Sequence, residues 1–188
     1  SNFKLLPQHD HIYFDIIKQN PKVNFWFIST KNKFVAQKFK SRISLICKEN
    51  DLILDDYFNF FPQTNYQSYL QLINKADIVL DSLDWSGLNT SIDALNLNKP
   101  VITLPSNLMR GRHSYGILKI LKMDELITNS KKEYVDLALK LSTDFNLHKN
   151  IVNKIETNKK ILFNNHKTTE YLENFLQSAL EDKKNQLQ

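Results

Sequence analysis

The residues best suited to chemistry form a polar loop followed by a helix pattern. Loop 82–88 ends at three side chains suited to capping a helix: Asn89, Thr90 and Ser91. The first turn of a helix leaves backbone N–H donors unpaired and carries the positive end of the helix dipole, so this segment predicts an anion site. Asp93 lies one turn further and faces the same crevice, where its carboxylate can accept two hydrogen bonds from a ribose diol. On the pattern alone, an ordinary capped helix explains these residues equally well.

A second candidate cluster lies in the stretch MRGRHS, at residues 109–114. Arg110, Arg112 and His113 come just after a predicted strand, and parallel sheets bind ligands at the carboxyl ends of their strands. These side chains are suited to a phosphate or to an acceptor substrate. For an Arg-Gly-Arg triplet alone, a basic helix start on the surface is the favoured interpretation.

Two weaker candidates precede these clusters. Lys4 lies beside a loop and can pair with a pyrophosphate as a point charge. Gln63 and Thr64 follow an apolar run, and the rings of Tyr66 and Tyr69 are suited to hold a base by stacking and hydrogen bonds. Taken alone, tyrosines on the surface of a helix are the plainer interpretation.

Short apolar runs with polar breaks predict the strands that position these residues. Near-continuous apolarity over four to eight residues is typical of strands covered on both faces, as in parallel sheets. These runs lie at residues 23–29, 57–61, 78–81 and 101–104, with a weaker edge strand at 126–128. Helix patterns separate them, at residues 10–19, 33–47, 65–74, 89–97 and 109–121. The alternation predicts an α/β fold, a Rossmann-like doubly wound parallel sheet with right-handed crossovers.

The last third of the chain has a different character. Residues 131–180 show three helix patterns and no strand signal. We expect residues 1–143 to form a ligand-binding lobe and residues 144–188 to form C-terminal helices packed on it, with a frayed polar tail from Asp182. A doubly wound domain normally begins with a strand, and none precedes the first helix. We therefore expect the chain to be the tail of something longer.

Composition excludes several classes of protein. Hydrophobic residues make up 41% and charged residues 24%, which excludes wholesale disorder. No apolar run approaches the roughly 20 residues of a membrane helix, and no signal peptide is visible. Cys47 is the single cysteine, so no intrachain disulfide is possible, and its helical apolar pattern places it in the core. Three glycines cannot build a GxGxxG or Walker A loop.

The histidines and the net charge bear on metal binding and on nucleic-acid binding. The five histidines form no HExxH or carboxylate–histidine cluster, so we expect no metal site. The net charge of +5 admits a nucleic-acid binder, but no segment combines clustered arginine with interleaved aromatics. Lysine-rich solvated helix faces explain the charge better. We expect a cytoplasmic protein that binds neither nucleic acid nor membrane.

Taken together, these blocks resemble the C-terminal catalytic lobe of the O-linked N-acetylglucosamine transferase (SPINDLY-like) family. The matching stretches are FKLLPQHD near the start, ADIVLDSLDWSGLNTSIDAL with KPVITLP, LMRGRHSYGILK, and DELI with EYVDLALKLSTD. They run in the family's order to about Asp144. The adhesin-type N-glycosyltransferases share the Asn-rich version of the loop and are the nearest relatives to confuse with it.

The resemblance implies a glycosyltransferase of the two-lobed GT-B type, of which this chain is the nucleotide-sugar lobe. It implies a UDP-sugar donor, inverting transfer of N-acetylglucosamine to Ser or Thr of proteins, and no metal or other cofactor. A missing N-terminal lobe and TPR repeats would lie upstream, and the chain alone would transfer little or no sugar. An N-glucosyltransferase lobe using UDP-glucose and Asn acceptors, or a catalytically silent binding module, is the alternative.

The resemblance also assigns roles to individual residues. Lys4 matches the lysine that contacts the pyrophosphate, and it is the catalytic candidate. Residues 89–91 fall in the helix start that holds the phosphates, and Asp93 matches the ribose-binding carboxylate. The uracil-facing loop matches the segment of Tyr66 and Tyr69, which stand where animal relatives carry a lysine and a histidine.

Overall fold

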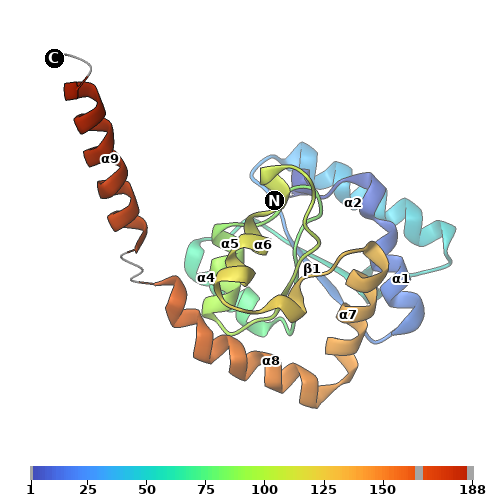
Figure 1. Ribbon diagram of the computed structural model, residues 1–188. Coiled ribbons are helices and arrows are strands. Elements are labelled where there is room, and N and C mark those ends of the chain that lie inside the picture. Colours follow the sequence, from blue (N-terminus) through green and yellow to red (C-terminus); the bar gives the residue numbers. More distant parts are fainter. Residues whose placement is uncertain (1, 164–166, 186–188) are drawn as a thin grey trace.

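The computed structural model describes residues 2–163 and 167–185. Figure 1 shows an α/β body in which helices surround short strands, and a last helix that stands apart from this body. The order of elements follows the predicted alternation of helix and strand up to the C-terminal third, which is helical.

The described residues contain four strands, which form two parallel pairs. The first pair joins β1 (Phe25–Ile28) to β2 (Phe58–Phe61), and the second joins β3 (Val79–Leu80) to β4 (Val101–Ile102). All four lie within predicted apolar runs, and the parallel pairing is confirmed. The described strands form two pairs rather than one sheet, so the doubly wound sheet stays a prediction.

The weaker run at 126–128 contributes a single parallel bridge between Ile127 and Thr103. The Thr103 N–H donates to the Leu126 carbonyl and the Thr128 N–H donates to the Thr103 carbonyl, at 3.1 and 2.9 Å. The predicted edge strand is therefore reduced to one bridge, which nevertheless continues the line of β4.

The first half of the body packs around aromatic side chains. Its helical elements are η1 (Asn2–Lys4), η2 (Pro7–His9), α1 (His11–Gln19), α2 (Lys33–Glu49) and the one-turn α3 (Leu54–Tyr57), which the sequence pattern missed. What we call the aromatic cluster consists of six buried residues from α1, α2 and β2: Phe14, Ile17, Phe39, Ile43, Cys47 and Phe58. The core position predicted for Cys47 is confirmed.

The second half of the body packs around aliphatic side chains and the second strand pair. Its helical elements are α4 (Tyr66–Lys75), α5 (Asn89–Asn96), η3 (Met109–Gly111), α6 (His113–Ile120), η4 (Asp124–Leu126), α7 (Lys131–Thr143), α8 (Phe145–Asn158) and η5 (Lys159–Leu162). Fully buried members of this core include Leu95, Ile102, Leu118, Leu126 and Ile155. Helix α8 thus contributes to the same core as the strands.

Three helices end in the same left-handed turn without glycine. The φ angles are 55° at Asp51, 59° at Asn98 and 55° at Lys122, after α2, α5 and α6. In each case the next N–H donates at 2.9 Å to a carbonyl five residues back, which satisfies the helix end. Glycine, the usual stop signal, is therefore absent from these boundaries.

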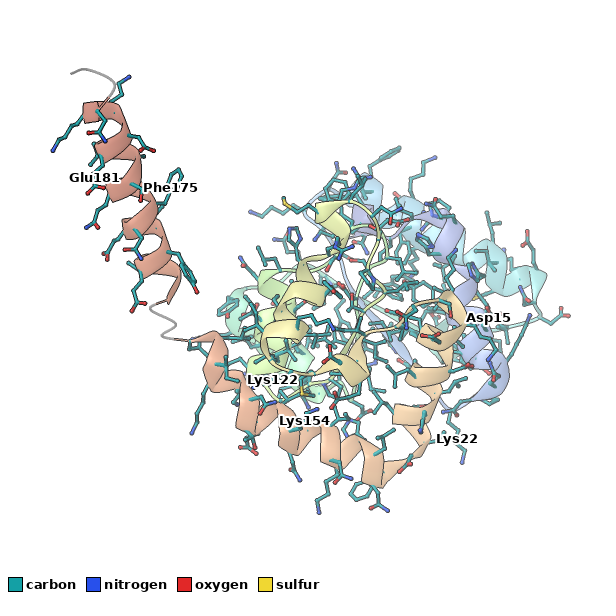
Figure 2. All side chains as sticks on the ribbon, viewed as in Figure 1. Asp15, Lys22, Lys122, Lys154, Phe175 and Glu181 are labelled. Atoms are coloured by element: carbon teal, nitrogen blue, oxygen red, sulfur yellow. The ribbon has the colours of Figure 1, made fainter. Side chains whose placement is uncertain are left out.

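The last helix, α9 (Lys167–Asn185), leaves its apolar side chains uncovered. Tyr171 is 72% exposed and Phe175 is 67% exposed. Figure 2 shows Phe175 and Glu181 well away from the α/β body. Helix α9 continues beyond Asp182, where a frayed tail was predicted, and the final three residues of that tail lie outside the described residues. In the described part of the chain, no helix is both long and apolar enough to cross a membrane.

Candidate functional site

Lys4 lies against the loop that leads into α5. Its Nζ donates to the Ser86 carbonyl at 3.1 Å, which joins two segments 82 residues apart. The short helix η1 that carries Lys4 is itself fixed, because the buried Asn2 side chain accepts a hydrogen bond from the Thr30 N–H at 2.9 Å. The lysine and the polar loop therefore share one side of the body, as the combined blocks of sequence predicted.

A buried carboxylate holds this loop. Asp81, which directly follows β3, is 7% exposed. Its Oδ1 accepts from the Gly87 N–H at 2.7 Å, and its Oδ2 accepts from the hydroxyls of Ser86 and Thr103, each at 2.7 Å. Burying an ionised carboxylate is costly unless hydrogen bonds compensate it, and these three donors do so. The two ends of loop 82–88 are therefore fixed to each other and to β4.

Three serine hydroxyls extend this network to α5 and α6. The Ser114 N–H donates to Ser86 Oγ at 2.8 Å, and Ser114 Oγ lies 2.7 Å from Ser91 Oγ. Ser114 Oγ also donates to the Gly87 carbonyl at 3.1 Å. Since all three serines are buried, the first turns of α5 and α6 are locked together.

The predicted side-chain caps of α5 are wrong. The N-cap is Leu88, and no side chain caps the helix. Ser91 points into the buried network instead, whereas Asn89 and Thr90 are exposed. The reason is competition, because the Ser114 hydroxyl offers Ser91 a buried partner that local sequence cannot reveal.

The start of α5 nevertheless presents backbone donors to solvent. The N–H groups of Ser91 and Ile92 already donate to the Leu88 carbonyl, at 3.1 and 3.0 Å. Within the described residues, the N–H groups of Asn89 and Thr90 have no such acceptor. A side chain at Gly87 would collide with the hydroxyls of the first helical turn, so the loop can approach α5 this closely only with glycine. The exposed tip is suited to an anion.

Tyr66, Tyr69 and Asp93, which were predicted for a base and ribose site, lie together between α4 and α5. Their role at such a site stays a prediction. The Tyr66 hydroxyl donates to Asp93 Oδ1 at 2.8 Å, and the two tyrosine rings stack with centroids 6.1 Å apart. The hydrogen bond to Asp93 raises the pKa of Tyr66, and burial, with the Asp93 charge, raises the pKa of Tyr69. Both phenols therefore stay protonated at neutral pH and can donate.

Gln63 and Thr64, the other residues predicted for the base site, lie in the connection between β2 and α4. Gln63 is exposed and Thr64 is half-buried. Their neighbour Asn65 caps α4, because its side chain accepts from the Ser68 N–H at 2.9 Å. Asn65 thus fixes the end of this connection, and neither Gln63 nor Thr64 has a side-chain hydrogen bond among the described residues.

Of the three predicted basic residues, one reaches the polar loop. The Arg110 guanidinium lies 5.0 Å from the centre of the Trp85 ring, and its carbonyl accepts from the Ser86 N–H at 2.8 Å. Arg112 lies instead over the Tyr115 ring, at 4.8 Å. His113 is the half-buried first residue of α6. The structure therefore gathers Arg110 with the site and directs Arg112 elsewhere.

The enclosed space at the site is small. A cavity of ≈ 30 Å³ lies between the N-terminal segment and the end of β3, lined by residues that include Lys4, His9, Asp81 and Tyr134. This volume is on the order of a single water molecule. The cavity is therefore too small to hold a nucleotide. Among the residues that the structure describes, no cluster of three His, Cys, Asp or Glu side chains could hold a metal ion.

The sequence prediction missed Asp81, Tyr134, Ser86 and Ser114. The Tyr134 hydroxyl donates to the Asp81 carbonyl at 2.8 Å, although the sequence placed Tyr134 only within a helix pattern and a family block. One signal for Asp81 was present, namely a carboxylate that ends an apolar strand before a Ser- and Gly-containing loop. A charge in that position needs donors, and the loop and β4 supply them.

Comparison with known proteins finds relatives of one kind. Residues 1–173 match the sequence profile of glycosyl transferase family 41. Over 142 residues, 76% of this chain, the sequence is 25% identical to the UDP-N-acetylglucosamine–peptide N-acetylglucosaminyltransferase of Caenorhabditis elegans, and covers 12% of that protein. Over 76 residues, 40% of this chain, it is 26% identical to a protein of Petunia hybrida named as a probable enzyme of this kind, SPINDLY, and covers 8% of it.

The fold also matches a solved structure, that of a mutant of the O-GlcNAc transferase of Thermobaculum terrenum. The TM-score is 0.82 at 21% sequence identity, over 95% of this chain and 34% of the other. The two chains therefore share a fold over nearly the whole of this one. The chain spans about a third of the solved protein and 12% or less of the two relatives described above.

Proposed function

The chain belongs to glycosyl transferase family 41, and from this premise we propose that it is the UDP-sugar-binding lobe of an inverting protein O-glycosyltransferase. In this proposal it is the C-terminal, Rossmann-like lobe of a GT-B enzyme. The donor is UDP-N-acetylglucosamine and the acceptor is a Ser or Thr hydroxyl of a protein. The names of the relatives favour N-acetylglucosamine over glucose and a peptide acceptor over other acceptors.

One observation carries the proposal. Lys4 contacts the Ser86 carbonyl at 3.1 Å, only three residues before α5 begins, so a single diphosphate can meet both the ammonium group and the helix tip. Both elements are positive, one by formal charge and one by the helix dipole. Within residues 2–163 and 167–185, Lys4 has no ion-pair partner, so these two converging positive groups are suited to an anionic ligand.

The same geometry supports a binding mode for the rest of the donor. The diphosphate would lie at the N–H groups of Asn89 and Thr90. The ribose diol would meet Asp93, and the base would lie against Tyr66 and Tyr69. Because Tyr66 already donates to Asp93 Oδ1, the ribose either uses the second carboxylate oxygen or displaces the phenol.

Transfer then proceeds by displacement. The acceptor oxygen attacks the anomeric carbon from the face opposite the UDP, and the bond between that carbon and the β-phosphate oxygen breaks. The electron pair leaves with UDP, and the hydroxyl proton passes to a base that we place outside this chain. Lys4 and the α5 tip stabilise the charge on the departing diphosphate, a role in which each donor of comparable sites is worth about 3–4 kcal/mol. No residue in this step needs a metal ion.

The acceptor site, the second lobe and helical TPR repeats would be supplied by further parts of the protein. This is consistent with the share of its relatives that the chain covers. We therefore expect the 188-residue chain to bind UDP and to transfer little or no sugar.

A thermal unfolding experiment with UDP tests the proposal. Millimolar UDP should raise the melting temperature by about 5 °C, as expected for a ligand well above its dissociation constant. Lys4→Ala and Asp93→Ala should each abolish most of the rise. Lys22→Ala removes an exposed lysine remote from the loop and is the matched control (Figure 2).

An unchanged melting temperature with UDP would contradict the proposal. Salt-sensitive RNA binding without a UDP effect would identify the chain as a nucleic-acid-binding module instead.

A further inference from the structure

A second contact, which the proposed function leaves unused, ties the N-terminal segment to loop 82–88. His9 is the last residue of η2, and its Nε2 lies 2.7 Å from Asp84 Oδ2. An ionised carboxylate only accepts, so the imidazole donates. The other ring nitrogen, Nδ1, is buried and has no partner among the described residues. Asp84 is therefore the group that holds the orientation of the His9 ring.

Asp84 meets His9 from an unusual backbone conformation. Its φ angle is 64°, in the left-handed region that few residues other than glycine adopt, although Asp tolerates it better than most. The Ser82 hydroxyl donates to the Trp85 carbonyl at 2.9 Å and closes the turn around Asp84. The turn thus presents the Asp84 carboxylate to His9 at the middle of the loop.

The other end of this contact is anchored to α2. Asp10 is buried and accepts two hydrogen bonds from Arg42, from Nε to Oδ2 at 2.5 Å and from Nη2 to Oδ1 at 3.1 Å. Arg42 Nη2 also donates to the Leu5 carbonyl at 2.8 Å. Residues 5–10 are therefore a fixed segment, and His9 connects this segment to the loop before α5.

The two contacts respond differently to a bound anion. A diphosphate oxygen is a stronger acceptor than the Ser86 carbonyl, so the Lys4 ammonium, which has three N–H donors, turns toward the ligand and can give up its contact with Ser86. The His9–Asp84 contact uses neither the ammonium nor a phosphate oxygen. It remains to hold the segment of Lys4 against the loop when the first contact is lost.

We propose that His9 and Asp84 form a positioning pair that keeps Lys4 within reach of a diphosphate at the start of α5. The inference rests on the proposed function and deepens it. His9 acts through Lys4, not on the ligand itself. Loss of the pair therefore weakens recognition of the diphosphate and leaves recognition of the nucleoside unchanged.

Calorimetric titration of the full 188-residue chain with UDP and with uridine tests the pair. His9→Ala should weaken UDP binding about tenfold and leave uridine binding unchanged. In a Lys4→Met background, His9→Ala should have no further effect on UDP binding, because the group through which His9 acts is gone. His11→Ala, at an exposed position of α1, should match the wild-type chain.

Two more variants separate positioning from folding. His9→Gln keeps a donor for Asp84 and should restore UDP binding to within about twofold of the wild-type value. If His9→Ala does not fold, Asp84→Ala tests the same contact from the half-exposed loop position and should give the same selective loss.

The outcomes distinguish this inference from the function on which it rests. A wild-type chain that binds no UDP overturns the proposed function. A wild-type chain that binds UDP, with His9→Ala weakening UDP and uridine equally or weakening neither, overturns the positioning pair alone. The same holds if the His9→Ala effect persists undiminished in the Lys4→Met background.

Discussion

Each half of the body is built on a pair of parallel strands with helices around it. The two halves nevertheless bury different kinds of side chain. The β1–β2 half is filled by the aromatic cluster, against which Phe25 packs, and the rings of Phe25 and Phe58 stack with centroids 5.5 Å apart. The β3–β4 half buries Asp81 together with serine and threonine hydroxyls next to its aliphatic core. The aromatic cluster needs only apolar area, whereas the network around Asp81 depends on geometry that gives its buried hydroxyls and backbone N–H groups an acceptor. The candidate site lies at the edge of the second half.

The largest effect should follow from removal of the buried carboxylate. Asp81→Ala leaves the Gly87 N–H and two hydroxyls without their acceptor in a buried place. At about 1–2 kcal/mol for each of the three orphaned donors, the free energy of unfolding should fall by about 3–6 kcal/mol. Urea denaturation measures the loss. As a control, Asp77→Ala removes an exposed carboxylate four residues earlier and should change the free energy of unfolding by no more than about 0.5 kcal/mol.

Equal losses of stability in the two halves should have unequal effects on ligand binding. Thr103→Val removes one donor to Asp81, and Phe58→Leu removes part of a buried ring. Each should cost about 1–2 kcal/mol of unfolding free energy. UDP binding should weaken in Thr103→Val, because Asp81 holds the loop before α5, and stay unchanged in Phe58→Leu. Calorimetric titration of both variants with UDP measures the two affinities. Equal losses of affinity would show that the two halves do not differ in their effect on the site.

Alkaline pH should destabilise the folded chain through buried tyrosines of both halves. Burial raises the pKa of Tyr13, beside the aromatic cluster, and of Tyr134, beside Asp81. A folded-state pKa above the unfolded value of about 10 gives a contribution that is fully present below pH 10. It is lost as pH rises further, by about 1.4 kcal/mol per pH unit for each tyrosine.

Phenylalanine at either position should reduce that slope, which urea denaturation between pH 9 and 11 measures. At neutral pH the two variants should differ. Tyr134→Phe loses the hydrogen bond to the Asp81 carbonyl and about 1 kcal/mol with it. Tyr13→Phe, set among the rings of Phe25 and Phe27, should be nearly neutral. Identical neutral-pH stabilities would show that the Tyr134 hydrogen bond contributes nothing.

The smallest effect should come from a region that belongs to neither half. Removal of residues 167–188 deletes α9, whose described apolar side chains are exposed, so the unfolding free energy should change by less than about 0.5 kcal/mol. Removal of residues 145–188 also deletes α8 with the buried Ile151 and Ile155, and should cost several kcal/mol. Differential scanning calorimetry of the two shortened chains makes the comparison. A large loss from the first would place α9 within the folding unit.

The order and type of most elements could be predicted because their signals are local. Apolar runs with polar breaks indicated all four strands, and the periodicity around Phe39 and Ile43 indicated α2. The limits of the helices were harder, since the left-handed stops at Asn98 and Lys122 carry no glycine. The one-turn α3 is too short for any periodicity to show.

The site could be predicted only where its residues are contiguous or match a family block. Loop 82–88 and the start of α5 are one stretch of sequence, and Tyr66 and Asp93 were expected at one ligand. The buried network was beyond prediction because Asp81 and Thr103 are 22 residues apart, and His9 and Asp84 are 75 apart. The fold brings such distant partners together, and no local pattern indicates them. For the same reason Ser91 contacts the Ser114 hydroxyl instead of capping α5.

The buried Cys47 is a natural probe of how often the β1–β2 half opens. The thiol is 1% exposed within the aromatic cluster, and burial raises its pKa. The thiolate is the reactive form, so a disulfide reagent can react with this single thiol only when α2 moves away from β2. A disulfide reagent that releases a dye on reaction with Cys47 would therefore measure how often the β1–β2 half opens in native buffer. Comparing this rate with and without UDP would show whether a ligand bound at the other half changes the opening.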